Sequence, residues 1–362
     1  SYPHLPPMSS SSQLTSSVSP IIHGGAIRGL AILAIFLHNY SHILSGIVTE
    51  NEYSFVSKHP HQLLYQLLHP TLELPLHLLS FFGHYGVPLF LFLSAYGLEK
   101  KYSVSDKPAP VGKFIASHYA KLWVMMIIGF LPFLSLDIIT ADGSRDPLAN
   151  IIPQLTMIST LFPFKPYMVW PGPYWYFPLM VQVYIVYRLF LFRRTWHWAV
   201  GMLLLCQLAQ HLFTNNIYVQ MWLRYNFIGS MLPFVLGLLY ARYGRSVSGK
   251  QALVLLILSS VGIFLGSFTM SSWLWVPALV CVAGLSLMQL LPQAIINPLA
   301  WVGSISSAIF ISHPLTRRII IYYFEDQHYL GLVIYTVVTI LVAWALQPVI
   351  NRATRWVAQR FA

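Results

Sequence analysis

Long apolar runs alternate with short polar segments along most of the chain. A helix needs about 20 predominantly apolar residues to cross a hydrocarbon core about 30 Å thick. About ten runs approach that length, and they predict an all-α integral membrane protein, a bundle of about ten transmembrane helices. The predicted spans are 25–45, 83–102, 114–136, 174–192, 196–213, 226–243, 251–268, 271–291, 303–324 and 329–350.

Three segments do not fit this alternation. Residues 45–82 contain "HQLLYQLLHPTLELPLHLLS", whose apolar periodicity predicts an amphipathic helix at the membrane surface or over a cavity. Residues 137–173 contain the apolar stretch "IIPQLTMISTLFPF", which is too short to span and is consistent with a re-entrant segment. Residues 1–22 are polar and rich in Ser and Pro, so we expect a flexible N-terminal segment followed by a single polytopic domain over 23–362.

Composition supports the membrane assignment. The chain is 56% hydrophobic and only 9% charged, whereas a soluble domain carries about 25% charged residues. The net charge of +11 could indicate nucleic acid. The basic residues lie in short segments between apolar runs, however, which is the positive-inside pattern. We therefore expect a lipid bilayer and no nucleic acid as a partner.

The same charges predict the orientation. With both termini in the cytoplasm, the inner segments receive most of the basic residues: Lys100, Lys101, Lys107, Lys113, Arg193, Arg194, Arg242, Arg245, Lys250, Arg352, Arg355 and Arg360. The outer segments then receive most acidic ones: Glu50, Glu52, Glu73, Asp142, Asp146, Glu325 and Asp326.

The first apolar run carries unusual chemistry. "IRGLAILAIFLHNYSHI" holds Arg28 at one end and His38 ten residues later, about 15 Å further along a helix. An ionisable group at that depth costs roughly 2–3 kcal/mol or more when charged, and it usually faces a cavity or a partner. A neutral histidine is the cheaper choice, and histidine is the usual general base.

His38 and His42 share a helix face, so a zinc site is an alternative. The zinc-peptidase pattern needs a glutamate directly after the first histidine, and that position is Asn39. We therefore predict no metal. Histidines hydrogen-bonded between helices are a third reading, favoured for His42.

Four stretches, in order along the chain, resemble the membrane-bound acyltransferase 3 family. They are "AIRGLAILAIFLHNYSH", "GHYGVPLFLFLSAYGLEKKY", "PGPYWYFPLMVQVYIVYRLF" and "LAWVGSISSAIFISHPL". The resemblance implies transfer of an acyl group, commonly acetyl from acetyl-CoA, to a hydroxyl of a carbohydrate or cell-envelope glycan. It also implies an essential first-helix histidine, here His38, and a donor-related arginine, here Arg28.

The chain departs from the family at three places, one of which is the turn Ser94-Ala95-Tyr96, where the family's glycine is absent. Members often have two arginines early in the third span, where this chain has His118 and Lys121. Many have a glutamate after the fourth-span tryptophan, where the closest polar residue is Gln182.

These residues suggest a reaction. A cytoplasmic rim of Arg28, Lys100, Lys101 and Lys121 would hold the phosphates of acyl-CoA, a donor substrate and not a permanently bound cofactor. His38 would deprotonate the acceptor hydroxyl, with an acyl-histidine as the alternative. Candidate acceptor-binding residues are Trp175, Tyr85 and His313, with His84 a weaker one. His313 could instead cap a carbonyl freed by Pro314, and we expect Arg317 and Arg318 to snorkel or to contact lipid phosphates.

Two other functions fit the same residues. A transporter or flippase could line its substrate path with Arg28 and His38. In a structural scaffold of an envelope complex, the two residues would have no chemical role. The order of the family motifs favours the enzyme, which we expect in a bacterial inner (cytoplasmic) membrane.

Overall fold

The computed structural model describes residues 23–361 except 104, 106, 141–146, 163, 164, 166 and 167. The N-terminal segment predicted at residues 1–22 lies outside the described residues. All regular elements in the described part are helical. They are α1 (Gly24–Ser41), α2 (Lys58–Leu68), α3 (Leu74–Phe82), η1 (Gly83–Tyr85), α4 (Gly86–Tyr102), α5 (Val111–Ile139), α6 (Pro147–Leu155), η3 (Gly172–Trp175), α7 (Tyr176–Val186), the π-helical turn η4 (Tyr187–Leu191), α8 (Trp196–Leu212), α9 (Ile217–Tyr225), α10 (Phe227–Tyr243), α11 (Gly249–Gly266), α12 (Met270–Trp273), α13 (Val276–Leu290), α14 (Gln293–Ser304), α15 (Ser306–Phe324) and α16 (His328–Arg360).

Each of the ten predicted spans falls on a helix, but fewer helices meet the length and hydropathy of a full crossing. Four of the described ones do: Leu74–Tyr102, Val111–Ile139, Gly249–Gly266 and His328–Arg360. Two bent pairs, α9 with α10 (48°) and α14 with α15 (71°), raise that number to six if each is one broken span. The chain is therefore an integral membrane protein whose described part is helical, and the count of about ten stays a prediction.

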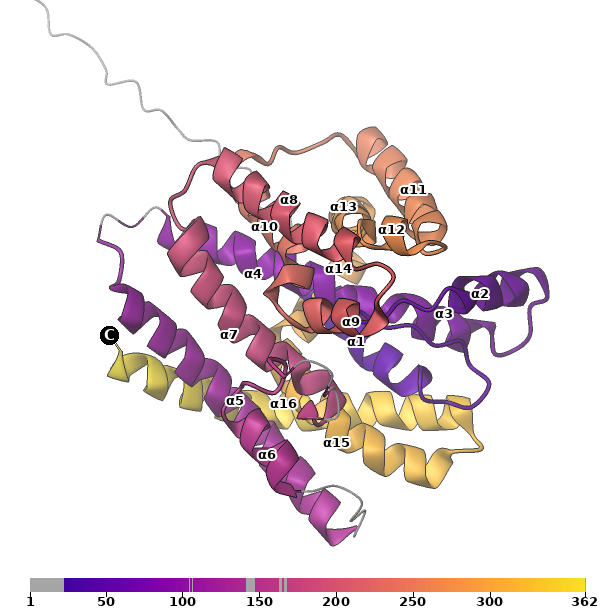
Figure 1. The fold of residues 1–362 in the computed structure, drawn as a ribbon. Coiled ribbons are helices and arrows are strands. Elements are labelled where there is room, and N and C mark those ends of the chain that lie inside the picture. The colour runs from indigo at the N-terminus through magenta and orange to yellow at the C-terminus, as the bar shows by residue number, and fades with distance from the viewer. Residues whose placement is uncertain are drawn as a thin grey trace, which may run out of the picture.

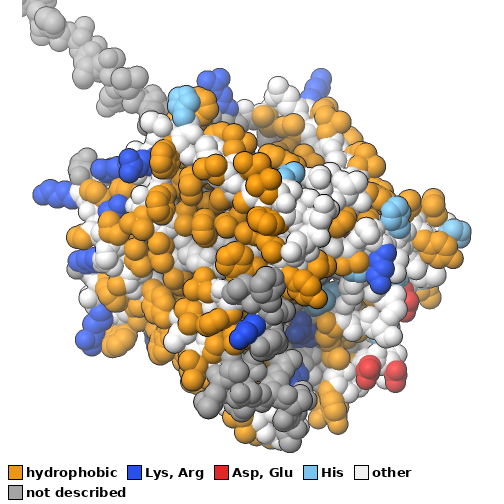
Figure 2. All heavy atoms as spheres, viewed as in Figure 1, with side chains coloured by type: hydrophobic (Ala, Val, Ile, Leu, Met, Phe, Trp, Pro, Cys, Tyr) orange, Lys and Arg blue, Asp and Glu red, His pale blue; other side chains and the backbone are white. Residues whose placement is uncertain are grey.

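The outward faces of α11 and α16 are apolar. Leu258 and Leu265 of α11 and Val333, Leu341 and Trp344 of α16 are all more than half exposed. Figure 2 shows hydrophobic side chains covering much of one face of the molecule. Such a surface suits lipid and not water, because a large exposed apolar patch on a soluble monomer would drive association.

Charges divide the bundle into two ends (Figure 1). At one end α4 finishes, α5 begins and α16 finishes; we call this the basic end, because Lys100, Lys101 and Lys113 lie there. At the other end lie α2, α3 and the α15–α16 connection; we call this the acidic end, because Glu73, Glu325 and Asp326 lie there. For these six residues the division agrees with the predicted separation of charges. Asp142 and Asp146 lie outside the described residues, and the cytoplasmic location of the termini stays a prediction.

The long segment after α1 folds differently from the prediction. The expected single amphipathic helix is two helices, α2 and α3, separated around Pro70. Proline lacks the N–H that a continuous helix needs and disfavours the helical conformation of the residue before it. Helix α3 then continues through η1 into α4, so the helical run of the second span begins at Leu74 instead of residue 83.

Helix α1 packs against its neighbours through glycines. A Cβ on Gly29 would overlap the backbone of Leu299 in α14, and one on Gly303 of α14 would overlap the backbone of Gly25. Gly83 of η1 has no room for a Cβ because His38 and Ala34 of α1 lie against it. Small residues allow helix backbones to approach this closely inside a membrane. The approach at Gly83 fixes the position of the His38 backbone.

Candidate active site

A cavity of about 610 Å³ runs beside α1, between α4, α5, α7 and α15. Its volume lies in the range of small-molecule sites, about 300–1,000 Å³. Arg28, His38 and Asn39 of α1 line it, as does His42 directly after the helix, so the cavity extends 14 positions along the chain here, about 21 Å. Other lining residues come from distant parts of the chain: Glu52, Tyr53, His84, Phe90, Met125, Trp175, Tyr176, Tyr184, Ser304, Ser307, Phe310, Arg317, Gln347 and Asn351.

His38 is held in one orientation inside the cavity wall. Its side chain is 5% exposed, and its Nδ1 lies 2.6 Å from the backbone oxygen of Ser80 in α3. A carbonyl can only accept, so Nδ1 carries the proton and Nε2 is left with a lone pair. Nε2 is not among the buried polar atoms that lack a partner. This arrangement makes Nε2 the basic atom of His38.

His42, the residue directly after α1, supports His38 from one turn further along the chain. Its Nδ1 donates to the backbone oxygen of His38 at 3.0 Å. The two rings stack with centroids 4.6 Å apart and an interplanar angle of 7°. Among the described residues, no group of three or more His, Cys, Asp or Glu side chains is placed to hold a metal ion.

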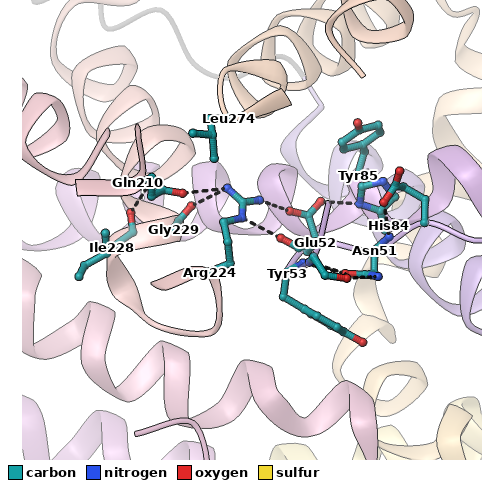
Figure 3. Close-up of polar contacts among 12 residues, drawn as sticks. Asn51, Glu52, Tyr53, His84, Tyr85, Gln210, Arg224, Ile228, Gly229 and Leu274 are labelled. Atoms are coloured by element: carbon teal, nitrogen blue, oxygen red, sulfur yellow. Dashed lines mark hydrogen bonds and ion pairs between the residues drawn. The ribbon is translucent and has the colours of Figure 1, made fainter. Parts of the chain in front are cut away.

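Glu52, His84 and Arg224 form a buried polar network (Figure 3). Glu52 Oε1 accepts a hydrogen bond from His84 Nδ1 at 2.8 Å, and Glu52 Oε2 pairs with Arg224 Nη2 at 3.0 Å. Arg224 Nε also donates to the backbone oxygen of Glu52 at 2.8 Å. The His84 ring centroid lies 5.7 Å from that of His38. Both carboxylate oxygens of Glu52 are thus engaged, one by His84 and one by the charge of Arg224, and the network fixes the loop that closes the acidic end of the cavity.

Glu50 lies two residues earlier and is buried without such partners. Its Oε1 accepts from the backbone N–H of Asn51 at 3.0 Å, and its Oε2 has no hydrogen-bond partner. Burial, with a smaller contribution from the nearby charge of Glu52, raises the pKa of Glu50 to about 8. Glu50 therefore carries a proton at neutral pH, unlike a carboxylate paired with arginine.

The cationic residues predicted to bind the donor lie in different places. Arg28 lines the cavity, is exposed, and has no ion-pair partner among the described residues. Lys100, Lys101 and Lys121 are not among the lining residues. Lys100 and Lys101 finish α4 at the basic end, where their ammonium groups lie over the rings of Tyr96 and Tyr102. The lysine contacts with the donor stay a prediction.

Of the residues predicted to bind the acceptor, only Trp175 and the weaker candidate His84 line the cavity. Trp175 is 7% exposed and meets Tyr53 and Tyr225 edge to face. Tyr85 is buried outside the cavity, with its hydroxyl 3.2 Å from Ser267 Oγ.

His313 is fully buried, and its Nδ1 donates to the backbone oxygen of Ile309 at 3.2 Å. That geometry matches the alternative reading of His313 as a carbonyl cap beside Pro314. Two residues at positions where the chain departs from the family, His118 and Gln182, also bond to other groups of the protein. His118 Nδ1 donates to the Phe114 backbone oxygen, and Gln182 bonds Asn226 Oδ1 at 2.7 Å.

The expectation that Arg317 and Arg318 snorkel or contact lipid phosphates is wrong for Arg317. Arg317 lines the cavity, and its Nη1 donates to the backbone oxygen and to Oδ1 of Asn39 at 3.0 and 3.2 Å. Arg318 is half-buried and pairs with Asp137 of α5. Adjacent helical residues point about 100° apart, so one faces the cavity while the other faces α5.

The fold and cavity define a helical membrane protein with a basic histidine atom in an internal chamber. The family model described as "Acyltransferase domain" (Acyl_transf_3) matches residues 25–347. The chain therefore belongs to the acyltransferase 3 family, whose members are membrane acyltransferases. No curated protein and no solved structure gives a significant match to the chain.

Proposed function

We propose that the protein transfers an acyl group, acetyl in the simplest case, from cytosolic acyl-CoA to a hydroxyl of a carbohydrate or cell-envelope glycan. The observation that carries this proposal is the cavity that joins Arg28 to the Nε2 side of His38. The anionic phosphates of the donor would lie at Arg28, with Lys100, Lys101 and Lys121 nearby at the basic end. The thin arm of the donor would then follow α1 and bring its thioester to His38.

The reaction needs one base. His38 Nε2 takes the proton of the acceptor hydroxyl as the oxygen attacks the thioester carbonyl. The tetrahedral intermediate collapses, the carbon–sulfur bond breaks, and the proton on Nε2 goes to the leaving thiolate. The products are the ester and free CoA thiol, and His38 returns to its starting state. The Ser80 carbonyl stabilises the positive ring between the two transfers, because it accepts from Nδ1.

The topology belongs to the same proposal. About ten spans with both termini in the cytoplasm would put the basic end, and the Arg28 mouth, on the side where acyl-CoA is made. The acceptor would enter from the acidic end, past Trp175. The membrane would be the inner (cytoplasmic) membrane of a bacterium.

The test is thiol release by the purified full-length chain in lipid nanodiscs, given acetyl-CoA and a panel of glycans. We expect His38→Ala to lower the rate by ~10²–10⁴-fold, the usual contribution of a positioned base. His211→Ala is the control, because His211 likewise donates Nδ1 to a backbone oxygen, that of Gln207, but does not line the cavity. Absence of thiol release from the wild type with every glycan would favour a transporter, and an unchanged rate in His38→Ala would remove His38 from the mechanism.

A further inference from the structure

Arg317 of α15 faces the cavity with part of its guanidinium unused. Its Nη1 makes both hydrogen bonds to Asn39. Asn39 Nδ2 in turn donates to the Ile35 backbone oxygen at 2.9 Å, which leaves Asn39 Oδ1 directed at Arg317. Nε and Nη2 of Arg317 make no hydrogen bond to the described protein, and neither is sealed away from the cavity. Two donors in a planar fork therefore remain open.

No carboxylate of the described chain neutralises Arg317. The only acidic residue among the described lining residues is Glu52, and its two oxygens are already engaged by His84 and Arg224. The partners of Arg317 are a carbonyl and an amide oxygen, which are neutral. A positive charge inside a membrane protein without a counter-charge is costly to keep, and such a residue commonly marks a substrate or ion pathway.

Arg317 and Arg28 cannot serve one small anion. Asn39, which Arg317 contacts, lies 11 residues after Arg28 on the same helix, about 16 Å further along its axis. The backbone oxygens of a helix point toward its C-terminus, so a group bonded to the Asn39 oxygen lies beyond His38, away from Arg28. The cavity therefore has an open cation on each side of His38.

We propose that Arg317 binds an anionic group of the acceptor, a carboxylate, phosphate or sulfate, while a hydroxyl of the same acceptor faces His38 Nε2. The guanidinium fork would hold two oxygens of the anion through Nε and Nη2. The substrate class is thus an acidic hydroxyl compound, such as a uronic acid or a phosphorylated or sulfated sugar. This inference rests on the proposed acyl transfer and specifies that the acceptor is anionic.

The first experiment measures equilibrium binding without any acyl donor, so that it does not depend on catalysis. Matched probes are methyl glucuronoside, glucose 6-phosphate and glucose 6-sulfate, each against methyl glucoside, at constant ionic strength. We expect the full-length wild type in nanodiscs to bind at least one acidic probe about 10- to 100-fold more tightly than the neutral sugar. Arg317→Gln should lose that preference and Arg318→Gln should keep it. Equal binding of acidic and neutral probes by the wild type would overturn the proposal.

The second experiment measures thiol release with the preferred acidic acceptor. Arg317→Gln should raise the acceptor KM about 10- to 100-fold and leave the KM for acetyl-CoA unchanged, with Arg317→Lys intermediate. S-acetylpantetheine, a donor without phosphates, tests the competing role. If the defect of Arg317→Gln disappears with that donor, Arg317 serves the donor phosphates and the proposal is wrong. If no thiol is released by the wild type with any acceptor, the acyl-transfer proposal fails, whereas anion binding is still decided by the first experiment.

Discussion

Arg224 and Arg317 both lie in the interior, toward the acidic end of the molecule. They differ in whether a carboxylate neutralises their charge. Arg224 is 5% exposed and meets Glu52 through both its side chain and its backbone oxygen. Arg317 lines the cavity, and its protein partners are the neutral oxygens of Asn39. A paired buried charge holds parts of a structure together, whereas an open one is available to a ligand. The difference separates a group that shapes the cavity wall from a group that acts inside the cavity.

The largest expected effect comes from breaking the pair. Glu52→Gln leaves the Arg224 charge buried without a counter-charge and weakens the bond to His84. Removing one partner of a buried ion pair typically costs about 3–5 kcal/mol, so we expect a comparable loss in the free energy of unfolding, measured by denaturant titration in detergent. Glu73→Gln is the control, because Glu73 is 46% exposed and lies 3.5 Å from His328. An equal effect of the two substitutions would show that the Glu52 network does not stabilise the fold.

The next effect concerns Glu50, a buried carboxyl with no arginine. Its pKa of about 8 lies above the ordinary value of 4.5, so the folded state binds the proton more tightly than the unfolded state does. The stability from this proton is fully present below about pH 4.5 and is lost as the pH rises through about 8. We expect about 2–3 kcal/mol of stability to be lost between about pH 6 and pH 9 from this group, measured as unfolding free energy against pH. Glu50→Gln should remove that part of the slope, and an unchanged slope would mean that Glu50 is ionised in the fold.

The smallest effect is expected from a substitution that gives Arg317 a carboxylate partner, as Arg224 has in Glu52. Asn39→Asp would give Arg317 a carboxylate partner where it now has an amide, and it removes only the Asn39 Nδ2 donor to the Ile35 backbone oxygen. We expect the acceptor anion to compete with this new partner, so its KM should rise about 10-fold while the KM for acetyl-CoA stays constant. Thiol release with a neutral acceptor is the control and should change little in KM. A larger KM for neutral and acidic acceptors alike would indicate a distorted α1 instead.

The sequence predicted what depends on one helix and missed what depends on several. Arg28 and His38 could be placed in one cavity because a fixed spacing on α1 relates them. Trp175 followed from a motif. The bond between Glu52 and Arg224 joins residues 172 positions apart, and no periodicity reveals such a pair. Arg317 and Arg318 are neighbours with the same charge, so only the rotation of α15 against α1 and α5 separates their roles.

Prediction of the helix breaks from the sequence is limited in the same way. Each of the ten predicted apolar runs falls on a helix, because hydropathy is a local property. Whether a run crosses as one straight helix depends on breaks such as those between α9 and α10 and between α14 and α15. Those breaks are set by packing against other helices, which composition alone does not encode.

The most direct test of the proposed acyl transfer is a structure of the full-length chain with a non-hydrolysable acetyl-CoA analogue bound. We predict that the phosphates of the analogue lie at Arg28. Its thioester-equivalent carbonyl should lie within about 3–3.5 Å of the position that an attacking oxygen would take beside His38 Nε2. Density for the nucleotide elsewhere, for example in the second cavity of about 400 Å³ lined by Tyr240, Arg245 and Gln289, with no part of the ligand reaching His38, would contradict it.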